Sequence, residues 1–135
     1  MMNNHAEMNA LKMRLVPTEK AAQTANIVPK GATMIGNTEA SENLNIRIDG
    51  EYEGTINMMR GGSVYISADA TVSTEKLIAD YIYVEGTVKG NLHARVAIEL
   101  SQTAKVNGSI RYDKDLDIHP GAKVSGQIST SETDD

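Results

Sequence analysis

The sequence predicts an all-β fold, a single parallel β-helix (β-solenoid) of about five to six rungs. A short apolar template recurs at a nearly constant interval, which is typical of solenoids. Apolar and polar residues also alternate with a period of two, which indicates strands with one buried face. The 135-residue chain is long enough for one such domain.

The template reads small residue, any, Val, any, Gly, any, Ile or Leu. It occurs at 86–92, 104–110 and 122–128, so that 18 residues separate successive blocks. Earlier copies lie at 50–56 and at 70–74, where Thr74 takes the Gly position and Leu77 the closing aliphatic position. The irregular loop 57–63 explains the longer spacing between these two earlier blocks. We therefore expect each block to form part of one turn of a coil.

Even-numbered positions are apolar or Gly over 44–56, 64–72 and 82–100, while odd-numbered positions are mostly polar. Gly50 and Gly86 fall on the inward parity and inside the alternation, where a hairpin turn would interrupt it. A coil uses such small residues at its corners, and it stacks Val88, Val106 and Val124 above one another. This pattern favours a solenoid over a meander of hairpins.

We expect three regions: a flexible N-terminal tail over 1–32, the β-helix over 33–128, and a disordered acidic tail over 129–135. Within the first region, Met8, Leu11 and Leu15 share one face of a possible short helix that Pro17 would end. This helix could anchor the chain to a membrane or a partner; a disordered tail is the simpler alternative.

The composition excludes several classes of function. The chain has no Cys, no Trp and no Phe, and its net charge is −5. Disulfides and Cys-based metal sites are thus excluded, and an acidic body argues against nucleic acid as a partner. The sequence contains no apolar run long enough to span a membrane and no secretory signal pattern. We expect a cytoplasmic protein, at most associated with the inner face of the membrane.

The 18-residue period is also compatible with the hexapeptide repeats of acyltransferases, which use a catalytic His. His93 and His119 have outward parity, and their spacing implies no acidic partner. Asp113, Asp115 and Asp117 alternate on one outward face and could bind a cation, but a solvated acidic edge explains them. Tyr65 and Tyr81 are spaced to stack on the outer surface. We expect no enzyme, no cofactor and no metal site.

The ends of a solenoid present unpaired strands and apolar surface unless a cap covers them. No capping helix is visible at either end of the predicted coil. We therefore expect self-association through terminal apolar residues. These are Ile35, Leu44 and Ile46 at one end and Ala122, Val124 and Ile128 at the other.

The segments 33–36, 48–56, 84–94 and 120–126 resemble the bactofilin family. The resemblance covers residues 33–128. It implies a right-handed β-helix that polymerises end to end, without nucleotide, into non-polar filaments. It further implies a bacterial cytoskeletal scaffold, often membrane-associated, that serves cell shape or cell-wall enzymes. The chain departs from the family in lacking both an N-terminal Met-Phe-type motif and an aromatic residue in the last rung. A β-solenoid adaptor that binds a partner without polymerising is the alternative.

Overall fold

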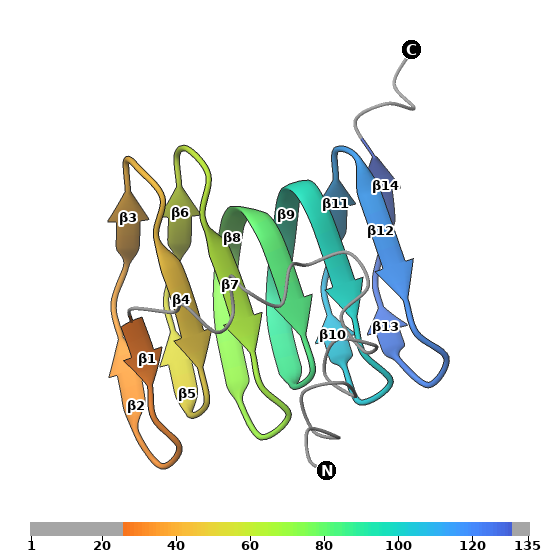
Figure 1. Cartoon of the computed structure of the whole chain (residues 1–135). Coiled ribbons are helices and arrows are strands. Elements are labelled where there is room, and N and C mark those ends of the chain that lie inside the picture. The colour runs from red at the N-terminus through yellow and green to blue at the C-terminus, as the bar shows by residue number, and fades with distance from the viewer. Residues whose placement is uncertain (1–25, 131–135) are drawn as a thin grey trace, which may run out of the picture.

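The computed structural model describes residues 26–130 as a three-sided coil of parallel strands (Figure 1). Fourteen strands form one continuous sheet, in which every pairing is parallel and joins one turn to the next. Each complete turn adds one strand segment to each of three faces. The predicted parallel β-solenoid of five to six rungs is therefore confirmed.

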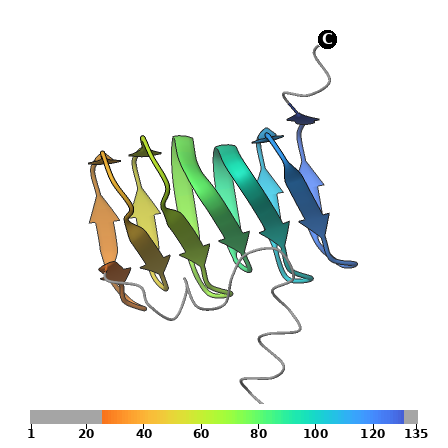
Figure 2. The same ribbon diagram turned by 45° about the horizontal axis from the view of Figure 1, so that its top comes forward.

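The coil has three faces, and each strand belongs to one or more of them. The first face holds β1 (Asn26–Val28), β4 (Asn45–Ile48), β7 (Ser63–Ile66), β12 (Asp115–Ile118) and the last residues of β8 (Thr71–Val84) and β9 (Thr87–Leu100). The second holds β2 (Thr33–Ile35), β5 (Glu51–Glu53), β10 (Lys105–Asn107), β13 (Lys123–Ser125) and the first residues of β8 and β9. The third holds β3 (Thr38–Ala40), β6 (Ile56–Met58), β11 (Ile110–Tyr112), β14 (Ile128–Thr130) and the middle of β8 and β9. Figure 2 shows β1–β3 at one end of the coil and β12–β14 at the other.

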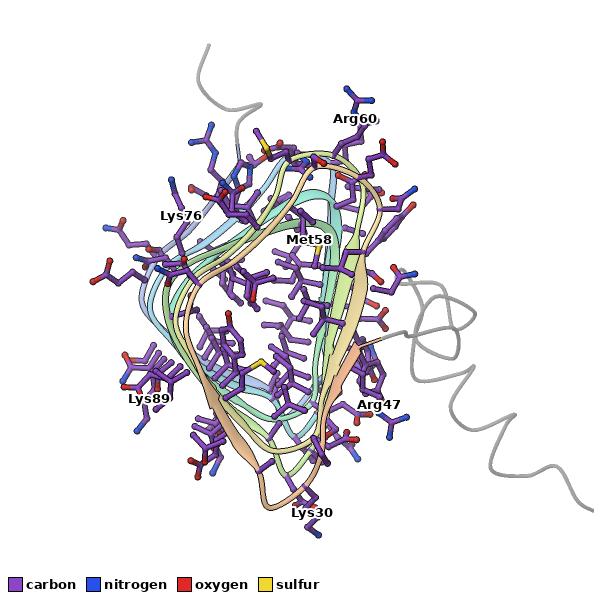
Figure 3. All side chains as sticks on the ribbon, turned by 90° about the vertical axis from the view of Figure 1, so that its left-hand side faces the viewer. Lys30, Arg47, Met58, Arg60, Lys76 and Lys89 are labelled. Atoms are coloured by element: carbon purple, nitrogen blue, oxygen red, sulfur yellow. The ribbon has the colours of Figure 1, made fainter. Side chains whose placement is uncertain are left out.

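The interior is a set of aliphatic stacks. Val88 pairs with Val106, which pairs with Val124, as the template predicts. Figure 3, a view along the coil, shows Met58 pointing inside while Lys76 and Lys89 point outward. Each fully buried aliphatic side chain contributes about 1.5–3 kcal/mol. A single turn has too few such side chains to offset the conformational entropy lost when it becomes ordered. Stacking compensates for this loss, because each turn buries its apolar side chains against those of its neighbours.

Glycine forms the corner between the second and third faces. Gly90, Gly108 and Gly126 have φ of +140° to +150°, which other residues rarely adopt. A Cβ on Gly108 would lie 1.8 Å from the carbonyl oxygen of Gly90. Thr74 pairs with Gly90 and so occupies the glycine position, as expected, with a register shift before Leu77.

The long loop after β6 is held by a single arginine from a later turn. Arg95 Nε donates to Asp80 Oδ1 at 2.8 Å, and its Nη2 donates to the carbonyl oxygens of Met58 and Gly61. The guanidinium of Arg95, in β9, thus links the loop after β6 to Asp80 in β8, so that three successive turns are joined at one corner. The continuous alternation over 82–100 does not reveal this corner, because β9 bends through it without leaving the strand conformation.

Two predicted boundaries differ from the observed strands. β1 begins at Asn26, inside the predicted tail 1–32, and pairs in parallel with β4. β14 continues to Thr130, inside the predicted tail 129–135. Three-residue strands are too short for alternation to mark them. Met8, Leu11 and Leu15 lie outside the described residues. No helix within residues 26–130 is long and apolar enough to cross a membrane.

Candidate functional site

The C-terminal end of the solenoid is an open apolar surface. β12, β13 and β14 each pair with a strand of the preceding turn, and no described strand covers their other edge. Their inward side chains are Leu116, Ile118, Val124 and Ile128. Ile118 is 38% exposed and Ile128 is 40% exposed, whereas their equivalents Leu100 and Ile110 in the turn below are fully buried. Among residues 26–130, no strand or helix caps this end, so its apolar interior is partly exposed.

The N-terminal end is more polar. Its inward positions include Met34, which is 50% exposed, and Thr38, which continues the stack of Ile56. The Thr38 hydroxyl lies 2.8 Å from the Tyr52 hydroxyl, which also lies 2.9 Å from the Gly36 carbonyl oxygen. The two ends thus differ in chemistry as well as in sequence.

The structure brings half of the predicted interface together. Ala122, Val124 and Ile128 all lie in the last turn. At the other end, Ile35 is 72% exposed but stands on the outer surface, in register with Glu53. Ile46 is only 6% exposed, because β1 adds a strand beyond β4.

Leu44 is half-buried against the core, just before β4. Sequence reasoning missed Met34, Leu116 and Ile118. Leu116 and Ile118 could have been predicted, because every strand of the last turn in the pattern, including the one that holds them, lacks a following strand to cover it.

Both outward histidines have acidic partners, contrary to the expectation that their spacing implies none. His93 Nε2 lies 3.1 Å from Asp113 Oδ1, and His119 Nε2 lies 2.7 Å from Glu99 Oε2. Each partner is 20 residues away, which is one 18-residue turn plus a step of two along the strand. Asp113 and Asp117 are therefore engaged with histidines rather than forming a purely solvated acidic edge.

Glu99, Asp117 and His119 form the one cluster within residues 26–130 that could hold a metal ion. Their ligand atoms lie within 4.8 Å of one another, and Glu99 is buried. In the structure His119 approaches both carboxylates, at 2.7 Å from Glu99 and 3.5 Å from Asp117. An imidazole–carboxylate pair accounts for this geometry without a metal.

The tyrosines stack differently from the predicted Tyr65–Tyr81 pair. Tyr65 is in register with Tyr83, and their ring centroids are 5.1 Å apart, while Tyr81 pairs with Ser63. Burial, followed by the neighbouring Glu85 carboxylate, raises the pKa of both Tyr65 and Tyr83 well above the usual value. Glu85 accepts a hydrogen bond from each hydroxyl, at 3.1 Å and 3.2 Å.

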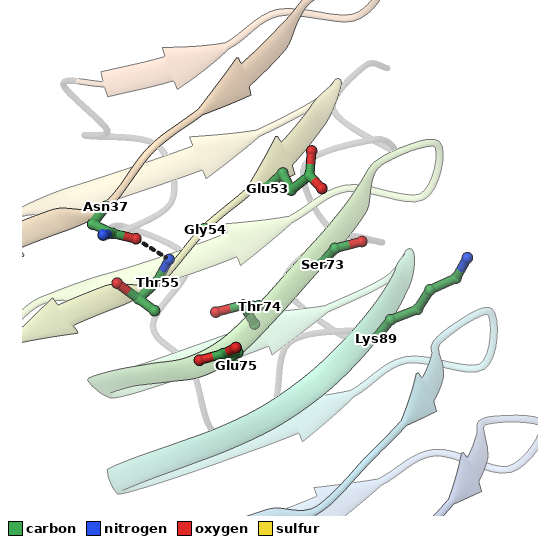
Figure 4. A pocket seen from close by; sticks show the side chains of 8 residues that line it. All are labelled: Asn37, Glu53, Gly54, Thr55, Ser73, Thr74, Glu75 and Lys89. Atoms are coloured by element: carbon green, nitrogen blue, oxygen red, sulfur yellow. Dashed lines mark hydrogen bonds between the residues drawn. The ribbon is translucent and has the colours of Figure 1, made fainter.

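A surface groove of about 520 Å³ runs along the corner between the second and third faces (Figure 4). Its charged lining residues are Glu53, Glu75 and Lys89. The Thr74 hydroxyl donates to the Lys76 carbonyl, and Asn37 accepts from the Thr55 backbone amide. Thr74 thus completes the local hydrogen bonding where the register shifts, and Asn37 does so at the equivalent corner of the first turn. The groove offers a mixed-charge surface rather than a cationic cradle for phosphate.

Comparisons with known proteins agree with the geometry. A family model described as "Bactofilin: Polymer-forming cytoskeletal" matches residues 26–129. The fold is similar to that in a cryo-EM reconstruction of Thermus thermophilus bactofilin double helical filaments. That match has a TM-score of 0.68 and 24% identity, and it covers 78% of this chain and 99% of the other. No curated protein matches the chain. Since the family model spans most of the sequence, the chain belongs to the bactofilin family of polymer-forming cytoskeletal proteins.

Proposed function

We propose that this chain forms nucleotide-independent filaments by stacking the ends of its solenoid. The observation that carries the proposal is the open C-terminal turn, where Ile118 and Ile128 expose about two fifths of their surface at positions buried one turn below. Covering this surface removes apolar area from water. It also pairs the uncovered edges of β12, β13 and β14, which otherwise resemble the reactive edge of any sheet.

Two identical open ends complete each other. A contact between two C-terminal turns is symmetric, so each apolar residue contributes twice, and the N-terminal turns form the second type of junction. The filament is then non-polar, in keeping with the resemblance stated above. The double helical filaments of Thermus thermophilus bactofilin, which has a similar fold, support filament formation by this fold.

The cellular role follows from the family and from the N-terminal segment. As a cytoskeletal polymer in the cytoplasm, the filament serves as a scaffold for cell-shape or cell-wall machinery. Met8, Leu11 and Leu15 supply an apolar face for contact with the inner surface of the membrane. Because β1 belongs to the first turn, the deletion that tests this role is residues 1–25 rather than 1–32. The shortened protein should keep its β-sheet signal and its assembly while losing liposome binding.

The decisive experiment places a charge on the open C-terminal turn. Val124→Arg or Ile128→Arg would put two like charges into each symmetric junction, at a cost of several kcal/mol. Ser125→Arg adds the same charge on the outer side of the same strand, and Lys123→Glu alters another outward position. Negative-stain imaging and sedimentation without nucleotide should show filaments for the wild type and both controls. The two inward variants should give short, folded species.

The size of the short species reports the polarity. In a non-polar filament, blocking the C-terminal junction leaves dimers joined through their N-terminal turns. A polar filament uses both ends in one junction, so the same variant would give monomers. Filaments from both inward variants would place the junction elsewhere. A wild-type protein that stays monomeric at high concentration would refute polymerisation and favour the adaptor.

A further inference from the structure

The first face carries an outward patch that differs from the rest of the solenoid surface. We call it the acidic–aromatic patch, and it consists of Tyr65, Tyr83, Glu85, Glu99, Asp117 and His119. Tyr65 pairs with Tyr83, Tyr83 with Glu99, and Glu99 with Asp117. Four successive turns thus align rings and carboxylates in one row across the face.

Two residues of this row have no exposed surface although they point away from the core. Tyr83 and Glu99 are both 0% exposed, while outward lysines on the second face, such as Lys89 and Lys105, are exposed. A carboxylate is stable in such surroundings only with charged or hydrogen-bonding partners, because desolvation otherwise costs several kcal/mol. Glu99 meets this requirement through His119 at 2.7 Å. The accessible part of the patch is formed by Tyr65, Glu85 and Asp117, which are half-buried, and its two carboxylates favour a positively charged occupant.

The charge of the patch is acidic. It contains three carboxylates and one imidazole among its six residues. Arg47 continues the row in register with Tyr65. Its guanidinium lies 5.7 Å from the Tyr65 ring centre and bonds to Asp49 at 3.1 Å. Basic side chains with long aliphatic stems suit this combination, since the stems cover rings while the heads meet carboxylates.

We propose that the basic stretch 12–20 of the same chain docks on the acidic–aromatic patch. This stretch contains Lys12, Arg14 and Lys20 against one acidic residue, Glu19. It joins the solenoid at Asn26 in β1, which lies in the same face as the patch. The charges of the two surfaces are complementary, and the covalent connection raises the local concentration of the segment.

The connection is long enough. From β1 to β12 the first face contains five strand spacings, or about 24 Å at ~4.8 Å each. Residues 12–20 precede Asn26 by 6 to 14 positions, which allows up to about 46 Å in an extended chain. Docking leaves both ends of the solenoid uncovered, so it is compatible with end-to-end stacking. The membrane contact proposed above for Leu15 requires the stretch to leave the patch.

The test is zero-length carbodiimide cross-linking of the full chain, read by peptide mass spectrometry. Coupling joins an amine to a carboxylate only where the two are in contact. We expect Lys12 or Lys20 to be linked to Glu85 or Asp117, and not to Glu51 or Glu53 on the second face. Assemblies prepared from an equal mixture of ¹⁴N and ¹⁵N subunits should give links within one isotope. Mixed-isotope links would assign the segment to a neighbouring copy and overturn the proposal.

A second measurement uses trypsin cleavage after Lys12, Arg14 and Lys20. Glu99→Gln with Asp117→Asn should speed this cleavage about tenfold, because charge-assisted contacts are lost. Glu51→Gln with Glu53→Gln, the matched control, should leave it unchanged. Equal rates in all three proteins would refute docking even if Glu99→Gln perturbs the fold. Absent cross-links together with destabilisation by a chelator would assign Glu99, Asp117 and His119 to a metal ion and also refute it.

Discussion

Replacing Gly108 by Ala tests whether the turns of this solenoid are stacked as closely as the structure indicates. The added Cβ would lie 1.8 Å from the Gly90 carbonyl oxygen and 2.6 Å from its carbonyl carbon. A real Cβ does not approach closer than 3.0 Å, so the two turns must separate at this corner. Separation weakens the backbone hydrogen bond next to this corner, in which the Leu92 amide donates to the Ser109 carbonyl at 2.9 Å.

Gly36→Ala is the matched control. Gly36 has φ of +147°, against +150° for Gly108, but nothing lies within 4 Å of its Cβ position. The control therefore costs only the backbone strain, about 1–3 kcal/mol. Gly108→Ala adds the loss of about two backbone hydrogen bonds at ~1 kcal/mol each and loosened packing around Val106 and Ile110. We expect it to cost about 2–4 kcal/mol more than the control.

Urea unfolding followed by circular dichroism measures the difference. Assembly stabilises the folded state by mass action, so midpoints must be compared at two protein concentrations. Equal losses of stability in the two variants would show that the corner can relax without cost. The close contact between carbonyl and glycine would then not be the reason for glycine at this position.

Three further predictions concern single contacts. Arg95→Ala should lower the free energy of unfolding by about 2–3 kcal/mol, because its charge-assisted hydrogen bonds are lost. The control Arg111→Ala, on the exposed side of β11, should change it by no more than about 0.5 kcal/mol in the same urea assay. Equal effects would refute the stabilising role of the Arg95 hydrogen bonds. The raised pKa of Tyr65 and Tyr83 means that folding favours the neutral phenols, so their contribution to stability should be complete below pH ~10 and fall as pH rises above it. An absorbance titration should show some tyrosines ionising at higher pH than the others, and Tyr65→Phe with Tyr83→Phe should remove this delayed phase. Ionisation of all tyrosines at the ordinary pH would contradict the prediction. Ile98→Ala should lower the free energy of unfolding by about 2–5 kcal/mol, because the Ile98 side chain is fully buried. Leu116→Ala, one turn later at the open end, should lower it by less but reduce the amount of sedimenting polymer. A larger loss of stability in Leu116→Ala than in Ile98→Ala would place the open end elsewhere.

Much of the fold was predictable because a solenoid places the same kinds of residue at equivalent positions of each turn, at a nearly fixed interval in the sequence. The stacking of Val88 under Val106, the Thr74 substitution and the displaced Leu77 all follow from the template. The first strand, β1, did not follow, because three residues preceding Pro29 give too little alternation. The hydrogen bonds of Arg95 to Asp80, Met58 and Gly61 could not be predicted either, because they depend on how the longer loop after β6 lies over the corners of later turns.

The candidate site was predicted unevenly for a related reason. Parity correctly identifies inward residues inside a strand, which places Val124 and Ile128 at the C-terminal end. It does not identify the last strand of each face, so Ile46 was assigned to an end that β1 occupies. Ile35 follows the apolar Met34, and alternation alone could not decide which of the two faces the interior. The offset of 20 residues between His119 and Glu99 would have revealed their contact had diagonal neighbours been considered.

The difference between the two ends has a consequence for assembly. The C-terminal turn offers four aliphatic side chains, Leu116, Ile118, Val124 and Ile128, while the N-terminal turn exposes Met34 and has the polar Thr38 at an inward position. Apolar contacts weaken on cooling, so the junction that buries more apolar surface loses more of its stability. In a non-polar filament the two junctions alternate, so cooling weakens one of them selectively. Dimers joined through their N-terminal turns are then the unit into which such a filament separates.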